Sequence, residues 1–550
     1  MERSLSAYTD EHILRYFGDV KENGLTEHGF PRLTSNIGIL ISNGIRRDLL
    51  PLFTEMMELC CKTIPRVKAA NDFSVREIIG CLIEVEASGI LPREVTERWR
   101  GYLRGIDPTA CYTCFAASPN GDEKNWALFT AVSEYFRQEA GLCDSGEFVE
   151  LQLSQQLKWM DENGMYMDAR SDIHHPMTYD LAPRGLFSLL LDRGYNGKHR
   201  DRIDAYLKQA GLLTLGMQSP CGEIPFGGRS NQFILCEGWM ITAYEYEIKR
   251  YEREGNRALA DAFRAAVAGA VGAMEEWLDK VPIRHIRNRY PTETGYGCER
   301  YAYFDKYMIT VASNIYAAYL ICGSSKPYTA SPDLKPSVTL TSDHFHKLFI
   351  GGGGYGLEFD LNADPHYDAN GLGRVHRRGA PSTVCMSTPC AAEPKYTVDI
   401  ESPFALSLCS AVYSEDGYIP GAEADTEYRV IYSGCEGDSA FAELLLTFRN
   451  NATVKESYRV NGEGVSVTAQ GEGRIAFVLP AFSFDGENTT VIKAEKNTLI
   501  VAYGGWICRY ITDGEIIDTG RIAANRNGHY REYLATGENT VNVKIEIVKE

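Results

Sequence analysis

The spacing of apolar residues changes along the chain, and this change limits the possible folds more than any other feature. Apolar side chains recur at helical spacing in the first 320 or so residues, as in 75–83 and 259–281. The segment 322–336 holds three prolines among serines and threonines, which is typical of a linker. Beyond it, apolar and polar residues alternate, as in 541–547. The sequence therefore predicts helices first and strands second.

The helical half contains repeated helices with short connections. Several of these helices are predicted to end at a glycine, such as Gly89, Gly211 and Gly255. Repeated helical hairpins can stack as an open solenoid or close into a toroid, and the periodicity leaves both open. After the linker, apolar runs such as 475–479 and 498–503 are separated by glycine-rich turns. Many short strands with such turns predict an antiparallel β-sandwich.

Charge and composition exclude several classes of function. Lys and Arg number 56 against 74 Asp and Glu, giving a net charge of −18, which argues against nucleic acid as a partner. An anionic polymer would need a locally basic site. No run of about 18 apolar residues is present, so no membrane partner is expected. The N-terminus has no apolar signal region, so we expect a cytoplasmic protein. Monomer and homo-oligomer both remain open.

Four clusters of polar and aromatic residues stand beside Gly or Pro in the helical half. Loops at one rim of a helical ring would bring such clusters together. The alternative is that these residues have only structural roles, as helix starts, turns and aromatic side chains of the core. The candidate residues in these clusters are Asn125 and Trp126; Asp168, His174, His175, Tyr179, Asp180 and Arg184; Glu223, Arg229 and Asn231; and Arg287, Arg289, Tyr296, Glu299, Arg300 and Tyr303.

The spacing of three of these clusters resembles a known group of enzymes. Asn125-Trp126 is followed after about 50 residues by His174 and Tyr179, and after about 50 more by Arg229. This order resembles the toroidal polysaccharide lyases of the chondroitin AC/hyaluronate type. The layout also resembles the heparinase II/III-like lyases, and the motifs are similar to those of exo-acting glucuronidases of glycoside hydrolase family 154. The motif match covers residues 120–310.

The resemblance implies an architecture and a substrate class. The fold class is a multidomain α+β chain, with an (α/α) toroid, either incomplete or a six-hairpin barrel, at residues 1–325. A linker at 326–336 then leads to an antiparallel β-sandwich at 337–550. The resemblance also implies an enzyme that cleaves uronic-acid-containing, glucuronate-type oligo- or polysaccharides, with an acidic glycan as its partner. No cofactor is required for that chemistry.

β-Elimination is the leading hypothesis, because the spacing of the Asn, His, Tyr and Arg residues fits it and a sandwich follows the toroid. The reaction removes the proton beside the uronate carboxylate, whose charge Asn125 and Arg229 would offset. Tyr179 or His175, with His174 beside it, would take the proton, and the tyrosine would return one to the leaving oxygen. Tyrosines and arginines suit stacking on sugar rings and gripping carboxylates. The predicted substrate-binding residues are Trp126, Arg184, Asn231, Arg287, Arg289, Tyr296, Arg300, Tyr303 and His376.

Two alternatives remain beside the lyase. Hydrolysis by an exo-glucuronidase needs two carboxylates on opposite sides of the glycosidic bond. The candidates for that pair are Asp168, Asp180, Glu223 and Glu299. The third alternative is a noncatalytic glycan-binding protein on the same scaffold, because a fold alone does not prove activity.

A further cluster lies in the strand-rich half. His344 and His346 are two apart, which predicts that they share one face of a strand. Mixed His and Asp ligands suit a divalent metal such as zinc or manganese. The alternatives are a polar loop with satisfied histidines, or a loop over the toroid with His376 reaching the substrate. The candidate ligands of a structural metal are His344, His346, Asp360, Asp364 and His366.

Overall fold

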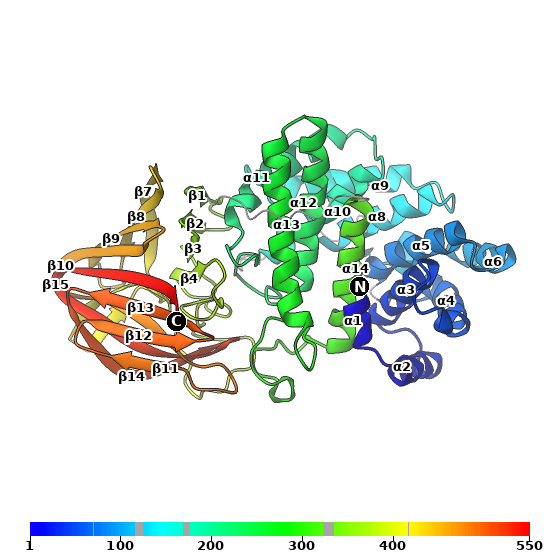
Figure 1. Cartoon of the computed structure of the whole chain (residues 1–550). Coiled ribbons are helices and arrows are strands. Elements are labelled where there is room, and N and C mark those ends of the chain that lie inside the picture. Colours follow the sequence, from blue (N-terminus) through cyan, green and yellow to red (C-terminus); the bar gives the residue numbers. More distant parts are fainter. Residues whose placement is uncertain (70, 116–124, 169–176, 323–334, 416) are drawn as a thin grey trace.

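The computed structural model describes residues 1–69, 71–115, 125–168, 177–322, 335–415 and 417–550. Helices occupy the chain up to Cys322 and antiparallel strands begin at Ser337 (Figure 1). This order confirms the predicted fold class. None of the described helices combines the length and the apolar composition that a membrane crossing requires.

Six helices form a closed inner ring. Each packs against the next in the series, and the last packs back against the first. They are α3 (Gly29–Ser42), α5 (Asn71–Ser88), α8 (Asn125–Glu139), α10 (Thr178–Asp192), α12 (Leu235–Arg253) and α14 (Phe304–Cys322). Residues 29–41 of α3 are all buried, as expected for a helix with neighbours on every side. Of the two predicted arrangements, the structure therefore has the toroid.

An outer helix precedes each inner helix along the chain. The outer helices are α2 (Asp10–Asn23), α4 (Leu50–Thr63), α6 (Arg93–Leu103), α9 (Gly146–Gln156), α11 (Arg200–Met217) and α13 (Arg257–Leu278). Two short helices, α1 (Glu2–Ser6) and α7 (Pro108–Cys111), complete the described helical part together with short 3-10 turns. Because inner and outer helices alternate, the inner helices all begin at the same end of the ring.

The predicted helix ends are mostly correct. Gly89 and Gly255 follow α5 and α12 with φ of 64° and 71°, a left-handed conformation that glycine adopts without strain. The predicted end at Gly211 is wrong, because this residue lies inside α11. A Cβ there would come within 2.9 Å of Glu247 on α12, so the glycine permits close helix packing.

The packing of α3 gives a stability prediction. A Cβ on Gly38 would lie 2.4 Å from both Cys81 and Phe53, so Gly38→Ala overpacks the core. We expect a loss of about 1–3 kcal/mol in the free energy of unfolding. Gly80→Ala in α5 is the control, because no described atom outside the adjacent backbone of α5 lies within 4 Å of the added methyl group, and we expect a gain of about 0.5–1 kcal/mol. Urea unfolding measures both, and equal stability of the two variants would contradict the packing.

Two antiparallel sheets make the C-terminal part. The smaller one has the order β1 (Ser337–Leu340), β2 (Lys347–Gly352), β3 (Tyr355–Asp360) and β4 (Gly371–Arg377). The larger one has eleven strands with the main path β11-β12-β13-β15-β10-β9-β8-β7. Its strands are β5 (Ser410–Ser414), β6 (Gly417–Pro420), β7 (Glu427–Glu436), β8 (Ser439–Thr447), β9 (Thr453–Asn461), β10 (Gly464–Phe484), β11 (Val491–Ala494), β12 (Thr498–Tyr503), β13 (Trp506–Thr512), β14 (Glu515–Asn525) and β15 (Gly528–Lys549).

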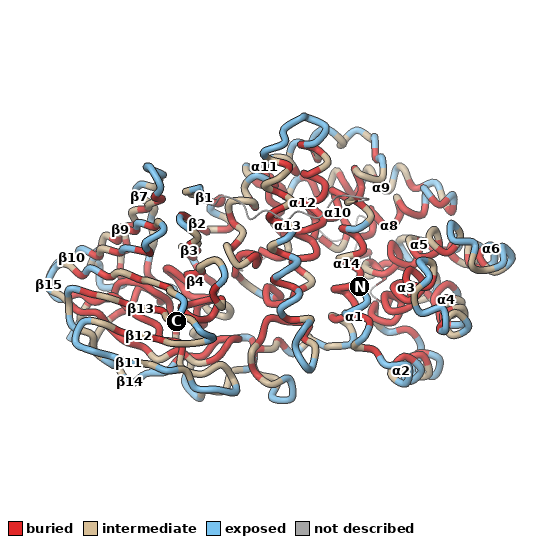
Figure 2. Tube along the Cα trace, in the orientation of Figure 1, coloured by how far each residue is buried: buried red, intermediate tan, exposed pale blue. Residues whose placement is uncertain are grey.

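The two sheets share one apolar core, so they form a sandwich. The ring of Phe359 on β3 meets that of Tyr458 on β9 edge to face at 4.7 Å between centroids. Figure 2 shows the buried residues along the facing strands. The predicted strand 498–503 is β12, and 541–547 lies within β15.

The smaller sheet lies between the helical ring and the larger sheet (Figure 1). A separate apolar cluster joins it to the ring, where Met165, Met177 and Met217 pack with Phe345 and Phe349. Loops of the helical part therefore rest directly on β-strands. This contact decides how the site described next is built.

Candidate active site

An open pocket lies at the end of the ring where the six inner helices begin. About 1110 Å³ of it is free of atoms, part of it open to solvent. Every inner helix lines it with residues from its N-terminal turns, among them Arg32, Phe73, Asn125, Tyr179, Trp239 and Lys306. We call this the ring pocket.

The ring pocket favours anions. Helix N-termini carry partial positive charge, and six of them converge here. Arg229 and Lys306 add basic side chains to the lining, and Arg32 also lies there, paired with the buried Glu77. Among the described residues that line the pocket, none is an aspartate or a glutamate. An anionic ligand thus finds a local field opposite to the net charge of the chain.

Tyr179 and Arg229 form the polar centre of the ring pocket. The Nε and Nη2 atoms of Arg229 donate to the Tyr179 hydroxyl oxygen at 3.2 and 2.9 Å. The guanidinium also lies 5.5 Å from the centroid of the tyrosine ring. Arg229 is exposed, and its Nη1 edge has no hydrogen-bond partner among the described residues. Tyr179 occupies the first turn of α10, whereas the candidate clusters were expected on loops at the rim of the ring.

Ser230 links Tyr179 to a second tyrosine. Its Oγ lies 3.0 Å from the Tyr179 oxygen and 2.5 Å from that of Tyr301. Ser230 has a φ of 67°, a left-handed conformation that costs a non-glycine residue about 1–3 kcal/mol. Its backbone N–H donates to Glu299 at 3.1 Å. The strained backbone is therefore held by a specific contact that aims the hydroxyl at both tyrosines.

The β-sandwich fixes that contact. Arg526, from the turn between β14 and β15, donates to both carboxylate oxygens of Glu299 at 2.9 Å and to the Gly297 carbonyl at 2.8 Å. Burial alone would raise the pKa of Glu299, but the Arg526 guanidinium more than offsets this and lowers it. Glu299 is thus an ionised carboxylate fully engaged in holding Ser230, which is not the acid–base role predicted for it.

Burial raises the pKa of Tyr179, and the adjacent Arg229 counteracts part of that rise. Burial also raises the pKa of Tyr301, and the nearby Glu299 adds to the effect. Both phenols are therefore protonated near neutral pH in the free protein. The proton of Tyr179 can lie toward Ser230, because Arg229 supplies two donors to the same oxygen.

The loop that carries Arg229 rests on the smaller sheet. The N–H of Gly228 donates to Asp368 at 2.7 Å, and Arg374 on β4 donates to the Ile224 carbonyl at 2.7 Å. Lys347 on β2 lies 3.3 Å above the centroid of the Phe226 ring. The sandwich thus positions the arginine of the pocket as well as its serine.

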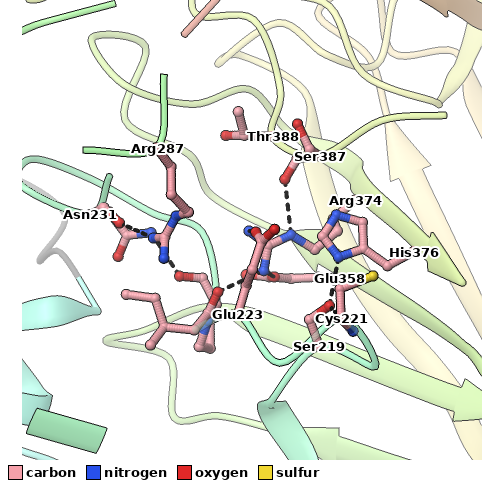
Figure 3. A network of polar contacts seen from close by, with 12 residues as sticks. Ser219, Cys221, Glu223, Asn231, Arg287, Glu358, Arg374, His376, Ser387 and Thr388 are labelled. Atoms are coloured by element: carbon pink, nitrogen blue, oxygen red, sulfur yellow. Dashed lines mark hydrogen bonds and ion pairs between the residues drawn. The ribbon is translucent and has the colours of Figure 1, made fainter. Parts of the chain in front are cut away.

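A buried network behind this loop contains four predicted residues, and Glu223 and His376 are two of them (Figure 3). Glu223 lies 3.5 Å from Arg374, and His376 Nδ1 lies 2.5 Å from the Ser219 hydroxyl. Burial would raise the pKa of Glu223, but His376, Arg374 and Arg287 together lower it to about 2. Burial, reinforced by Arg374, lowers the pKa of His376 to about 3. Neither residue lines the ring pocket, so the prediction that His376 reaches the substrate is corrected.

Two other carboxylates proposed as acid or base serve the ring itself. Asp168 accepts the backbone N–H of Asn125 at 2.8 Å at the start of α8. Asp180 is fully buried and forms an ion pair with Arg184, which also donates to Thr214 at 2.6 Å. Neither Asp180 nor Arg184 lines the ring pocket. Although Asp180 and Arg184 lie close to Tyr179 in the sequence, they share the face of α10 that points into the core.

Several predicted substrate-binding residues also lie outside the ring pocket. Arg287 is buried against Glu237, and Asn231 donates to the Pro225 carbonyl at 2.7 Å. Arg289 pairs with Glu276 at 3.0 Å. Tyr296 packs on Tyr290, and the side chain of Tyr303 is exposed. Arg300 lines a second hollow beside the ring pocket.

The predictions that the ring pocket does bring together are Asn125, Trp126, Tyr179 and Arg229. Trp126 meets Phe73 edge to face at 4.8 Å, forming an aromatic wall. His174 and His175 lie outside the described residues. Asn125 is buried at the first position of α8, where its side chain borders the pocket.

The predicted metal ligands have other partners. His344 and His346 precede β2 in a turn, so they do not share a strand face. His346 Nδ1 lies 2.7 Å from Asp360, which also pairs with Lys347 at 3.0 Å. Asp364 accepts the N–H of His366 at 2.9 Å. Within the described part of the chain, no three His, Cys, Asp or Glu side chains are grouped as a metal would require.

Sequence reasoning missed Arg32, Lys306, Tyr367 and Arg526. Arg32 and Lys306 belong to the first and last inner helices, which share no recognised motif. One signal was available, because a basic residue in the first turns of an otherwise buried helix faces either a polar space or an acidic partner. Arg32 is such a residue, buried and paired with Glu77 at 3.0 Å.

No protein-family model matches the chain, and no curated protein matches it. Solved structures with a similar fold include a chondroitin lyase that is a baculovirus envelope protein, at a TM-score of 0.47 and 9% identity, covering 94% of this chain and 76% of that one. A heparan sulfate lyase from Pedobacter heparinus has a TM-score of 0.33 and 9% identity, covering 90% and 75%. A glycosyl hydrolase of family 88 from Bacteroides vulgatus has 0.36 and 12%, covering 56% and 98%.

Proposed function

We propose that the protein is a lyase that cleaves uronic-acid-containing oligo- or polysaccharides by β-elimination. The observation that carries this proposal is the Tyr179–Arg229–Ser230 cluster in an anion-favouring pocket, with no carboxylate among its described lining residues. A phenol held by a guanidinium is a proton carrier next to a carboxylate-binding group. This combination is what elimination on a uronate needs.

The uronate carboxylate would bind to the unpartnered Nη1 edge of Arg229 and to the amide of Asn125. Charge-assisted hydrogen bonds of this kind offset the carboxylate charge and make the adjacent carbon–hydrogen bond more acidic. Trp126 and Phe73 offer apolar faces for the sugar ring beside this clamp. The six helix N-termini favour the same negative charge.

Tyr179 would carry the proton. In its phenolate form, the oxygen accepts two N–H bonds from Arg229, and Ser230 can turn its hydroxyl to donate a third. The phenolate takes the proton from the carbon beside the carboxylate, the electron pair forms a carbon–carbon double bond, and the glycosidic carbon–oxygen bond breaks. Tyr179 then donates the same proton to the leaving oxygen, which regenerates the phenolate.

Hydrolysis is less well supported. It needs an acid and a base on two free carboxylates about 5–9.5 Å apart across the bond to be cleaved. Asp168, Asp180, Glu223 and Glu299 are each engaged with a backbone N–H or an arginine. A carboxylate tied to a buried partner is poorly suited to exchange protons with a substrate.

The products distinguish elimination from hydrolysis. We expect incubation with a panel of glucuronate-containing oligosaccharides to give a 232 nm chromophore, because elimination leaves an unsaturated uronate. Reaction in ¹⁸O water should leave the products unlabelled, since no bond to solvent oxygen forms. Labelled products without the chromophore would favour an exo-glucuronidase. Binding with neither result would leave a noncatalytic glycan-binding protein.

The pKa of Tyr179 sets the expected pH dependence. Because burial raises this pKa, the phenolate is a small fraction at neutral pH and grows as pH increases. We therefore expect kcat/KM to rise with pH between 6 and 9, by up to about tenfold per unit while the pH lies below the pKa. Initial 232 nm rates measure this profile, with a thermal unfolding scan at each pH as the control. A flat or falling profile would contradict Tyr179 as the base.

A further inference from the structure

A second hollow opens beside the ring pocket and shares its rim. It contains about 1060 Å³ of space free of atoms and is open to solvent. Arg229 and Tyr301 line both spaces, so the two are contiguous at these residues. Arg300 belongs to the helical side of the hollow, whereas Tyr367, Lys395 and Tyr396 belong to the sandwich.

The two walls of this hollow are joined through the backbone. The N–H of Gly297 donates to the Thr397 carbonyl at 2.7 Å, and the N–H of Thr397 donates to the Cys298 carbonyl at 3.2 Å. Arg526 lies behind the same wall, 4.1 Å from the centroid of the Tyr396 ring. The hollow is therefore a formed surface of both domains and not a loose gap between them.

Its charge is positive. Arg300 and Lys395 are exposed, and neither forms an ion pair with the described residues. Glu299 is the carboxylate of the lining, and Arg526 neutralises it with two hydrogen bonds. Two uncompensated cations in a chain with net charge −18 make this rim suited to anions.

The apolar surface of the hollow comes from tyrosine rings. Tyr301 and Tyr367 are half-buried and Tyr396 is buried, so each ring is fixed by packing while bordering the hollow. Tyrosine rings combine a flat apolar face with a polar edge, which suits a sugar. Cations and tyrosines together match an anionic sugar better than a neutral one.

We propose that this hollow is a second subsite, which binds the sugar next to the one in the ring pocket and prefers that sugar to carry a carboxylate. Because Arg229 and Tyr301 stand on the boundary, the bond cleaved under the proposed function lies between the two subsites. The proposal rests on that function for the reaction, but the binding itself is measurable without turnover. It predicts a substrate with negative charge on at least two units.

The test measures binding to full-length Tyr179→Phe, which is expected to be inactive. The probes are glucuronate, its β-1,4-linked dimer and the neutral β-1,4-linked glucose dimer, studied by calorimetry at low salt. We expect the glucuronate dimer to bind at least about tenfold more tightly than the monomer, because only the dimer fills both subsites, and the neutral dimer to bind more weakly than the glucuronate dimer. Arg300→Ala combined with Lys395→Ala should remove the gain of the dimer and reduce its salt dependence.

The matched control is Arg429→Ala with Lys493→Ala, which removes the same charge from exposed sites on β7 and β11. This control should keep the gain of the dimer over the monomer. An equal gain in both double variants, no gain in any protein, or no binding of any probe would overturn the subsite. A gain that depends on Arg300 and Lys395, in a native protein that forms no unsaturated product, would instead reject the proposed lyase and keep the subsite.

Discussion

Replacing Tyr179 with phenylalanine is expected to lower kcat by about 10²–10⁴-fold, the usual worth of a positioned acid–base group. The substitution removes only the oxygen that accepts the two Arg229 N–H bonds and faces Ser230. KM should change little, because the aromatic ring remains in place. The 232 nm assay measures the loss, and an unchanged circular dichroism spectrum excludes unfolding.

Tyr301→Phe is the matched control. Tyr301 also lines the ring pocket and also contacts Ser230, at 2.5 Å, but its oxygen has no bond from Arg229. We expect a loss of about tenfold or less, through weaker positioning of Ser230. If Tyr301→Phe abolished turnover while Tyr179→Phe remained active, the two tyrosines would have to exchange roles in the mechanism.

Arg229→Ala is expected to lower kcat/KM by about 10²–10³-fold, as the loss of a charge-stabilising donor does in other active sites. Arg229→Lys keeps the charge but loses the planar fork that bonds Tyr179 through two nitrogens. We expect this variant to lose at least about tenfold, or about 1.4 kcal/mol. The rising part of its pH profile should also move to higher pH, because the phenolate loses a donor.

Arg289→Lys is the control for that pair of variants. Arg289 was predicted to bind substrate, but it pairs with Glu276 and stacks 5.4 Å from the centroid of the Trp277 ring, outside the ring pocket. Its replacement should leave kcat/KM unchanged. Unchanged kinetics for Arg229→Lys as well would remove Arg229 from the site.

The sequence predicted the order of the fold because periodicity reports burial on one face. The alternating run 541–547 lies within β15, and the helical run 259–281 coincides with α13 from residue 259 to Leu278. The periodicity of apolar residues could not predict that the helices close into a ring. Closure depends on contacts between α14 and α3, which are separated by more than 250 residues, and each inner helix is buried on most sides. A helix that is buried on all sides has no single apolar stripe, so its sequence does not indicate which helices it packs against.

The site was predicted in part for a similar reason. Arg229 stood out because a charged side chain that follows two glycines has little packing value, and Tyr179 stood out through its spacing from Asn125 and Arg229. Asp180 and Arg184 stood out in the same cluster as Tyr179, yet they form a buried pair. Sequence cannot distinguish a charge aimed at a ligand from a charge aimed at an internal partner. Arg526 was missed altogether, since its partner Glu299 lies 227 residues earlier in the chain.

That long separation has a consequence for how the protein is made. Glu299 leaves the ribosome well before Arg526, because the two residues are 227 positions apart in the sequence. At about 5–20 residues per second, roughly 10–45 s of synthesis pass before the clamp on Ser230 can close. The helical ring can pack during that time, but Glu299, which accepts the N–H of the strained Ser230, is not yet held by Arg526. Synthesis through Arg526 must therefore precede the proposed activity, so a nascent chain that ends before Arg526 is expected to be inert.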